Sequence, residues 1–133
     1  MKNLLGIIVA AFLLQGLIFA QDKPAPVASS GVRVEKIVVA TSVENREPVG
    51  ENTEFQASAG TLSCWTKIMA SSTPTTIKHV WYVDNQKVFE QPLEIKMPST
   101  RTWSTKSVHP GSWKVDVTDE SGAVLSTVSF AVK

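Results

Sequence analysis

The sequence predicts an all-β protein, an immunoglobulin-like antiparallel β-sandwich of seven or eight short strands. Two observations lead to this fold class. From Val32 onward the chain is rich in Val, Thr and Trp, and turn signals recur about every ten residues. No segment carries an amphipathic helical repeat of useful length. Short strands at this spacing, in a length of chain suited to one domain, favour two packed sheets.

The first twenty residues have the pattern of an export signal. Lys2 precedes an apolar run from Leu4 to Ala20, and the polar sequence QDKPAP follows. We expect cleavage after Ala20 and a periplasmic or secreted protein. The run is at the lower limit for crossing a bilayer, so an uncleaved inner-membrane anchor formed by residues 4–20 stays open as the alternative.

Removal of the signal leaves a short tether and one domain. Residues 21–31, rich in Pro, Ala and Ser, are expected to be a flexible tether, and residues 32–133 form the domain. The chain has thirteen Lys or Arg against twelve Asp or Glu, and Lys2 goes with the signal, so the remainder is formally neutral. No charge block stands out, which argues against nucleic acid as a partner. A membrane is expected as a partner only if the signal stays uncleaved.

The strands follow from runs of β-forming residues bounded by turn residues. The sequence VDNQ at 83–86 predicts a tight hairpin, because Asp and Asn tolerate positive φ. HPGS at 109–112 and DESG at 119–122 predict further turns. Strands are expected at 32–43, 54–58, 61–70, 75–83, 86–95, 100–107, 112–118 and 123–132.

Alternate residues of a strand share a face, and this sorts the aromatic residues. Trp81 falls with apolar neighbours on its strand, as does Trp113, so both are expected in the core. Trp65 falls on the more polar face of its strand, and Trp103 lies in a strand with no obvious core side. Tyr82 lies on the face opposite Trp81, where we expect a partly exposed surface.

Cys64 is the only cysteine, so an internal disulfide is excluded. It falls on an apolar strand face, which predicts a buried, unreactive thiol rather than a nucleophile paired with His79 or His109. Two histidines thirty residues apart and one cysteine do not form a metal-ligand pattern. No phosphate-binding loop or nucleophile elbow appears. We therefore expect no enzymatic activity, no cofactor and no metal.

Five segments resemble the bacterial domain of unknown function DUF2914 over roughly residues 44–132. They are REPVG at 46–50, LSCWTKI at 62–68, TTIKHVWYVDNQKV at 75–88, STRTWSTKSVHPGSWKVDV at 99–117 and DESGAVLSTVSF at 119–130. The positions that match the family's pattern are Arg46, Pro48, Cys64, Trp65, His79, Trp81, Tyr82, Arg101, Trp103, Ser104, Gly111 and Trp113. The turn HPGSW is shorter here than in some members. The resemblance implies an exported or membrane-associated β-domain and assigns no activity.

Binding is the function class that the residues favour. Trp65, Tyr82, Arg101 and Trp103 are large residues on faces that are not plainly apolar, and such residues suit stacking on sugars or on a partner's side chains. Arg101 has three alternatives: a ligand carboxylate, an internal pair with Glu90 or Glu94, or stacking on Trp103.

Two further residues are possible members of that surface, His79 and Lys78. His79 lies on an apolar face, which favours a core residue with hydrogen-bonded ring nitrogens over a ligand or a pH switch. We expect a non-catalytic binding module of the cell envelope that binds carbohydrate through the aromatic and arginine face. The alternative is an interaction or structural module that docks another envelope protein through that face or a strand edge.

Overall fold

The computed structural model describes residues 31–133, so the predicted export signal and all but the last residue of the predicted tether lie outside the described residues. The strands in this part of the chain are β1 (Val32–Glu44), β2 (Glu47–Glu51), β3 (Glu54–Phe55), β4 (Thr61–Ala70), β5 (Thr75–Val83), β6 (Gln86–Ile95), β7 (Ser99–Ser107), β8 (Gly111–Thr118) and β9 (Val124–Val132). A single 3-10 turn, Ala57–Ala59, lies between β3 and β4.

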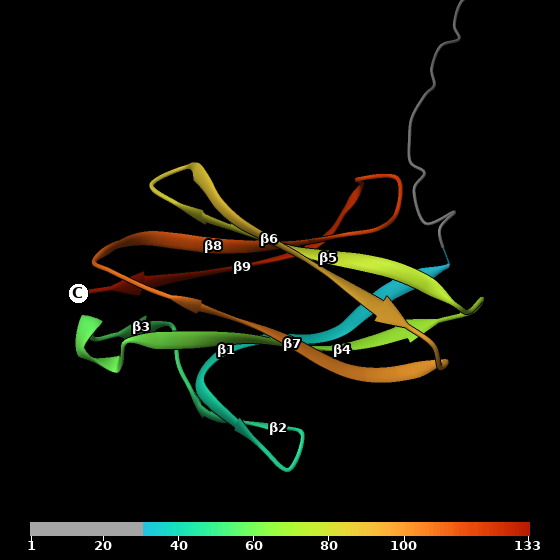
Figure 1. Ribbon diagram of the computed structural model, residues 1–133, viewed down its shortest axis with the longest axis horizontal. Helices are drawn as coiled ribbons and strands as arrows, with labels where there is room; N and C mark the ends of the chain where they lie inside the picture. The colour runs from blue at the N-terminus through green and yellow to red at the C-terminus, as the bar shows by residue number, and fades with distance from the viewer. Residues whose placement is uncertain (1–30) are drawn as a thin grey trace, which may run out of the picture.

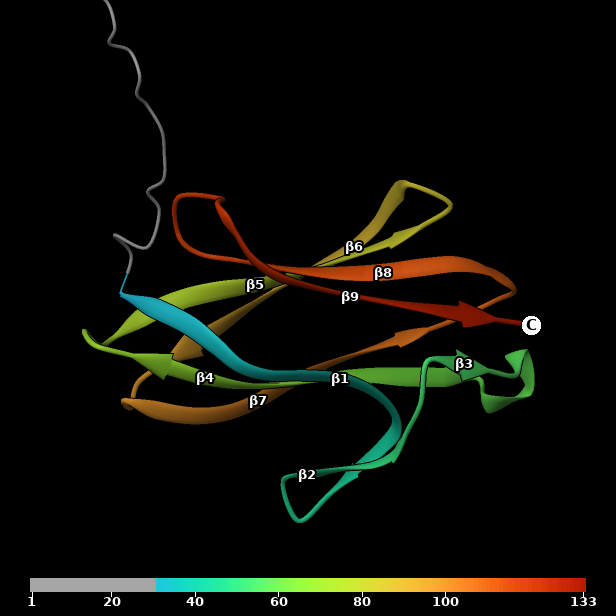
Figure 2. The same ribbon diagram turned by 180° about the vertical axis from the view of Figure 1, so that it is seen from behind.

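Two sheets stack face to face, as Figures 1 and 2 show from opposite sides. The four-stranded sheet has the order β2-β1-β4-β7, and the five-stranded sheet has the order β3-β9-β8-β5-β6. This arrangement confirms the predicted all-β sandwich. It differs from the prediction in having nine strands among residues 31–133 and in one parallel pairing, between β3 and β9.

The core lies between the sheets and is built by alternate residues of their inner faces. Trp81 of β5 and Trp113 of β8 are 0 % and 2 % exposed, which confirms that both are core residues. Their rings meet edge to face with centroids 6.2 Å apart, a favoured geometry for aromatic pairs. Cys64 contributes to the same cluster from β4, in the opposite sheet.

Two tight turns share one conformation. Asp84 and Asn85 in the β5–β6 turn both have positive φ, as the sequence predicts, and so do Asn45 and Arg46 in the β1–β2 turn. Positive φ at both central residues gives the twist that suits a two-residue hairpin. In Figure 1 the β1–β2 hairpin projects below the four-stranded sheet, on the side away from the core.

No helix within residues 31–133 combines the length and the apolar character needed to cross a bilayer.

Candidate functional site

The outer face of the four-stranded sheet carries two rows of side chains that run across its strands. Val38 of β1, Trp65 of β4 and Trp103 of β7 are direct partners in the register, so they form a row of apolar and aromatic groups. The β1–β2 hairpin folds over this row. Trp65 is only 2 % exposed as a result, and Trp103 is half-buried.

Polar contacts hold the hairpin against the sheet. The indole Nε1–H of Trp65 donates to the carbonyl oxygen of Arg46 at 3.0 Å, and the Arg46 guanidinium donates to the carbonyl oxygen of Arg101 at 3.2 Å. The same guanidinium lies 5.9 Å from the ring centroid of Trp103, within range of a cation–π contact. Arg101 forms an ion pair with Glu47 of β2. The hairpin and the sheet thus enclose a preformed space.

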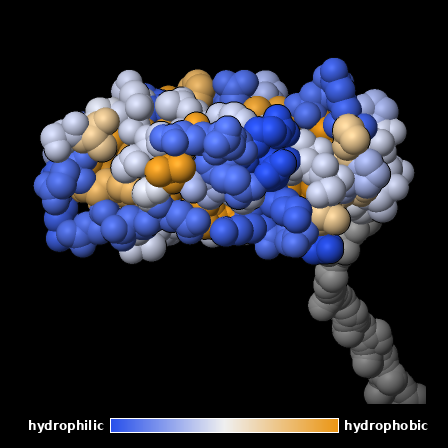
Figure 3. Space-filling model, turned by 90° about the horizontal axis from the view of Figure 1, so that it is seen from below, coloured by the Kyte–Doolittle hydropathy of each residue, from blue (hydrophilic) through white to orange (hydrophobic). Residues whose placement is uncertain are grey.

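That space is a cleft of about 630 Å³. Its lining is Glu35, Lys36, Arg46, Glu47, Trp65, Lys67, Ser99 and Arg101, and we call this set the cleft. Four of these side chains are cationic and two are carboxylates. Figure 3 views the molecule from this side and shows a mostly hydrophilic surface with isolated hydrophobic residues.

A second row in the cleft consists of Lys36 of β1, Lys67 of β4 and Arg101 of β7, and we call it the cationic row. Lys67 is the direct register partner of both other residues. Lys36 lies over the Trp65 ring at 5.9 Å from its centroid. Three like charges therefore stand side by side across three neighbouring strands.

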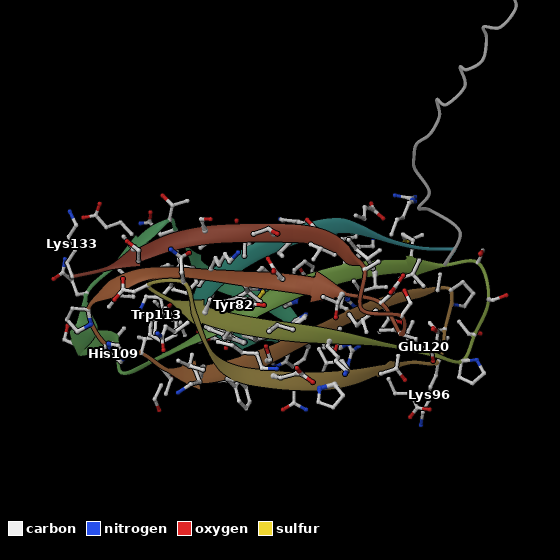
Figure 4. The ribbon with its side chains drawn as sticks, turned by 90° about the horizontal axis from the view of Figure 1, so that it is seen from above. Tyr82, Lys96, His109, Trp113, Glu120 and Lys133 are labelled. Atoms are coloured by element: carbon white, nitrogen blue, oxygen red, sulfur yellow. The ribbon has the colours of Figure 1, made fainter. Side chains whose placement is uncertain are left out.

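The four residues predicted to form one binding surface do not lie together. Trp65, Arg101 and Trp103 share the outer face of the four-stranded sheet. Tyr82, on β5, points outward from the five-stranded sheet, on the opposite side of the sandwich, and Figure 4 views the molecule from that side. Lys114 lies 4.8 Å from the Tyr82 ring centroid.

Lys78, a possible member of the predicted surface, is on the same outward face as Tyr82. Its ammonium group pairs with Glu90 at 3.2 Å. Two of the predicted binding residues are therefore separated from the rest by the thickness of the core.

Two expectations for the remaining residues also need correction. Trp65 is not an exposed platform, because the hairpin covers it. Arg101 pairs with Glu47 rather than with Glu90 or Glu94, and the cation over Trp103 is Arg46 rather than Arg101. Neither contact was predictable from local sequence patterns, because both depend on the β1–β2 hairpin, whose second strand the composition did not predict.

His79 lies in the core, 0 % exposed, within a chain of hydrogen bonds between the two sheets. Its Nδ1 is 2.7 Å from Ser104 Oγ, and its Nε2 is 3.2 Å from Thr66 Oγ1. The Trp81 indole N–H donates to Ser104 Oγ at 2.9 Å, and Thr66 Oγ1 donates to the Thr102 carbonyl at 2.9 Å. Both ring nitrogens of the histidine therefore have partners from the facing sheet.

These contacts fix the tautomer of His79. Thr66 uses its hydroxyl hydrogen on a carbonyl, so it accepts from Nε2–H of the histidine. Nδ1 is then unprotonated and accepts from the Ser104 hydroxyl, which itself accepts from Trp81. Every donor in this series of hydrogen bonds has an acceptor, as a buried polar network requires. Burial lowers the pKa of His79 from its ordinary 6.5 to about 4, so the ring is neutral at physiological pH.

A serine hydrogen-bonded to a histidine raises the question of catalysis, and the geometry answers it. Ser104 is 5 % exposed and its lone pairs face Trp81, while the far nitrogen of His79 meets a threonine instead of an orienting acid. A nucleophile needs an open approach for the substrate and an oriented base. This pair therefore serves packing between the sheets.

Cys64 is also buried, 0 % exposed, and burial raises the pKa of its thiol. A thiol in this state is unreactive, because the thiolate is the nucleophile. Among residues 31–133, no group of three or more His, Cys, Asp or Glu side chains is placed to hold a metal ion.

The described residues define an all-β sandwich domain with a charged, preformed cleft on one outer face and a sealed polar network in the core. Residues 74–132, which run from just before β5 to the end of β9, match the family described as protein of unknown function (DUF2914), and this match confirms the predicted resemblance over this part of the chain. The matched segment is shorter than the predicted resemblance and contains two of the cleft residues, Ser99 and Arg101. A search of curated proteins found no match to the chain.

Proposed function

We propose that this chain is an exported, non-catalytic binding module of the cell envelope, and that it binds carbohydrate in the cleft beneath the β1–β2 hairpin. The observation that carries the proposal is the attachment of the hairpin. Trp65 and Arg101 hold Arg46 in place, so the walls of the cleft exist before a ligand arrives. A preformed site loses less conformational entropy on binding than one that must be assembled.

The chemistry of the lining suits a ligand rich in oxygen atoms. Lysine and arginine donate several hydrogen bonds each, and carboxylates accept them, so hydroxyl groups find both kinds of partner here. Trp65 forms a rigid floor that the ligand does not stack on, since the hairpin covers its ring. Recognition in this cleft therefore depends on polar contacts, in contrast to the aromatic platform expected from the sequence.

The test is to fill the cleft without disturbing the core. Ser99 is an exposed cleft residue, so Ser99→Trp adds bulk to the space while leaving the packed layers intact. Ser129→Trp is the matched control, because Ser129 is exposed on the five-stranded sheet. The readout is retention on a column of immobilised envelope polysaccharide.

Wild type and Ser129→Trp should be retained, and Ser99→Trp should elute with the unbound fraction at an unchanged melting temperature. Equal retention of all three proteins would remove the cleft as the site. No retention of the wild type on any envelope polysaccharide would remove the carbohydrate function itself.

The second candidate is docking of an envelope protein, and the free edge of β7 favours it. β7 is the terminal strand of its sheet, contains no proline and pairs with β4 without a register shift. A regular edge strand without proline is suited to adding a strand from a partner. Hydrogen exchange separates the candidates, because strand addition would slow exchange of the outward-facing β7 amides, whereas a ligand in the cleft would leave them unchanged.

A further inference from the structure

The cationic row has an arrangement that sheets ordinarily avoid. Like charges directly opposite each other on neighbouring strands are destabilising, and here the unfavourable pairing occurs twice, between Lys36 and Lys67 and between Lys67 and Arg101. Sequences tend to break such local rules at functional sites. The cationic row does not stabilise the fold, which indicates that it has a functional role.

Each cation of the row has a carboxylate partner, including Glu47 for Arg101, so the excess positive charge of the cleft comes from Arg46. Lys36 pairs with Glu51 at 3.6 Å and Lys67 pairs with Glu35 at 3.8 Å, and all four side chains are more than a third exposed. Exposed ion pairs at such distances contribute little, so a ligand can displace them. Arg46 adds a fourth cation, and among residues 31–133 it has no carboxylate partner within ion-pair distance.

We propose that the ligand of the cleft is an acidic polysaccharide whose carboxylate groups bind the cationic row and Arg46. This inference rests on the proposed carbohydrate function and names the class of sugar polymer. Neighbouring strands lie about 4.8 Å apart, a separation comparable to the length of one sugar ring. A polymer that crosses the strands thus presents successive carboxylates to Lys36, Lys67 and Arg101, and each arginine can hold a carboxylate with two parallel hydrogen bonds.

The shape of the site favours a single polymer chain over other polyanions. The cationic row and Arg46 lie on two walls of a cleft, so a flat bilayer of acidic lipids cannot reach both walls. Proteins that hold single-stranded nucleic acid combine a positively charged groove with exposed aromatic rings on which the bases stack. Here Trp65 is 2 % exposed and one face of Trp103 is taken by Arg46.

The experiment measures binding to polygalacturonate and to its fully methyl-esterified form, which has the same backbone without the charges. The variants are Lys67→Gln in the centre of the row, Lys36→Gln as a second test of the row, and Lys114→Gln as a control. Lys114 lies on the outer face of the five-stranded sheet, so its replacement makes the same change in net charge away from the cleft. Vesicles of acidic phospholipid and a single-stranded oligonucleotide are the comparison probes.

Wild type and Lys114→Gln should bind polygalacturonate, with an affinity that falls as salt is raised. The two row variants should bind about tenfold more weakly, which corresponds to about 1.4 kcal/mol, and the methyl ester should not bind. The melting temperatures of Lys67→Gln and Lys36→Gln should equal or exceed that of the wild type, because each substitution removes a contact between like charges.

Equal binding of the acidic polymer and its ester, unaffected by Lys67→Gln, would overturn the acidic assignment and leave the carbohydrate function standing. Binding to the vesicles or the oligonucleotide without binding to polygalacturonate would overturn it in favour of those ligands. Failure to bind either form of the polymer, or any neutral envelope polysaccharide, would overturn the carbohydrate function as well.

Discussion

Lowering the pH from 7 to 4 should remove about 3 kcal/mol of folding free energy through a single residue, His79. In the folded state burial lowers its pKa to about 4, whereas the unfolded chain has the ordinary value of 6.5. The unfolded state therefore binds more protons between these two values, and stability must fall as the pH falls through this window. Each pH unit of separation is worth about 1.4 kcal/mol. The contribution is complete above pH 6.5 and levels off below pH 4.

The hydrogen bonds of His79 explain in structural terms why its pKa is low. A protonated His79 would donate from Nδ1 to Ser104, which already accepts the Trp81 N–H and would then need a new acceptor for its own hydroxyl. The two ring nitrogens are hydrogen-bonded to the hydroxyl groups of Thr66 and Ser104, and neither partner carries a charge that would offset the loss of hydration of a protonated ring. Protonation and the native network thus exclude each other.

Urea unfolding at pH 7, 6, 5 and 4, followed by tryptophan fluorescence, measures the effect. The free energy of unfolding of the wild type should fall by about 3 kcal/mol more than that of His79→Gln, which has no group to titrate. The carboxyl groups of the chain make the same contribution to the pH dependence of both proteins, so their contribution cancels in the difference. Parallel pH profiles for the two proteins, or an NMR titration of the His79 ring with a midpoint near 6.5, would refute the reasoning.

Three further substitutions or reagents test the packing. Trp81→Ala should cost about 3 to 5 kcal/mol, because it opens a cavity in the core and removes the donor to Ser104, and a melting temperature within a degree or two of the wild type would contradict this. Trp65→Ala should also destabilise the domain, by about 3 kcal/mol, because the hairpin covers the Trp65 ring and the indole N–H is hydrogen-bonded to the hairpin. An unchanged melting temperature would show that the hairpin does not pack against the sheet. Cys64 should react with thiol reagents only after denaturation, and rapid stoichiometric labelling of the native protein would show that it is accessible.

Most of the fold follows from local sequence patterns. The strands at 61–70, 75–83 and 86–95 match the predicted bounds, because β-forming residues and strong turn residues bound each of them. β2 was not predicted. Its sequence, EPVGE, contains proline, glycine and two glutamates, all of which are uncommon in strands, and it forms because the tight turn at Asn45 and Arg46 returns the chain along β1.

The candidate site was less accessible to sequence reasoning. Alternation correctly placed Trp65 and Tyr82 on the outward faces of their strands, but it does not say which sheet a strand joins. The two residues therefore appeared to share a surface, whereas the sandwich puts them on opposite sides. The cationic row is invisible in the sequence for a related reason, since its members come from three strands and only the register brings them together.

The central claim is that the cleft on the outer face of the four-stranded sheet is the binding site, and the four tryptophan side chains allow it to be tested in one spectrum. In a protein labelled with nitrogen-15, each indole N–H gives one signal. Trp65 lines the cleft and Trp103 lies beside it on β7, against the Arg46 guanidinium, whereas Trp81 and Trp113 lie in the core. On titration with envelope polysaccharide, the signals of Trp65 and Trp103 should shift while the two core signals stay in place. Shifts confined to Trp81 and Trp113, or four signals that do not respond to any envelope polysaccharide, would contradict the claim.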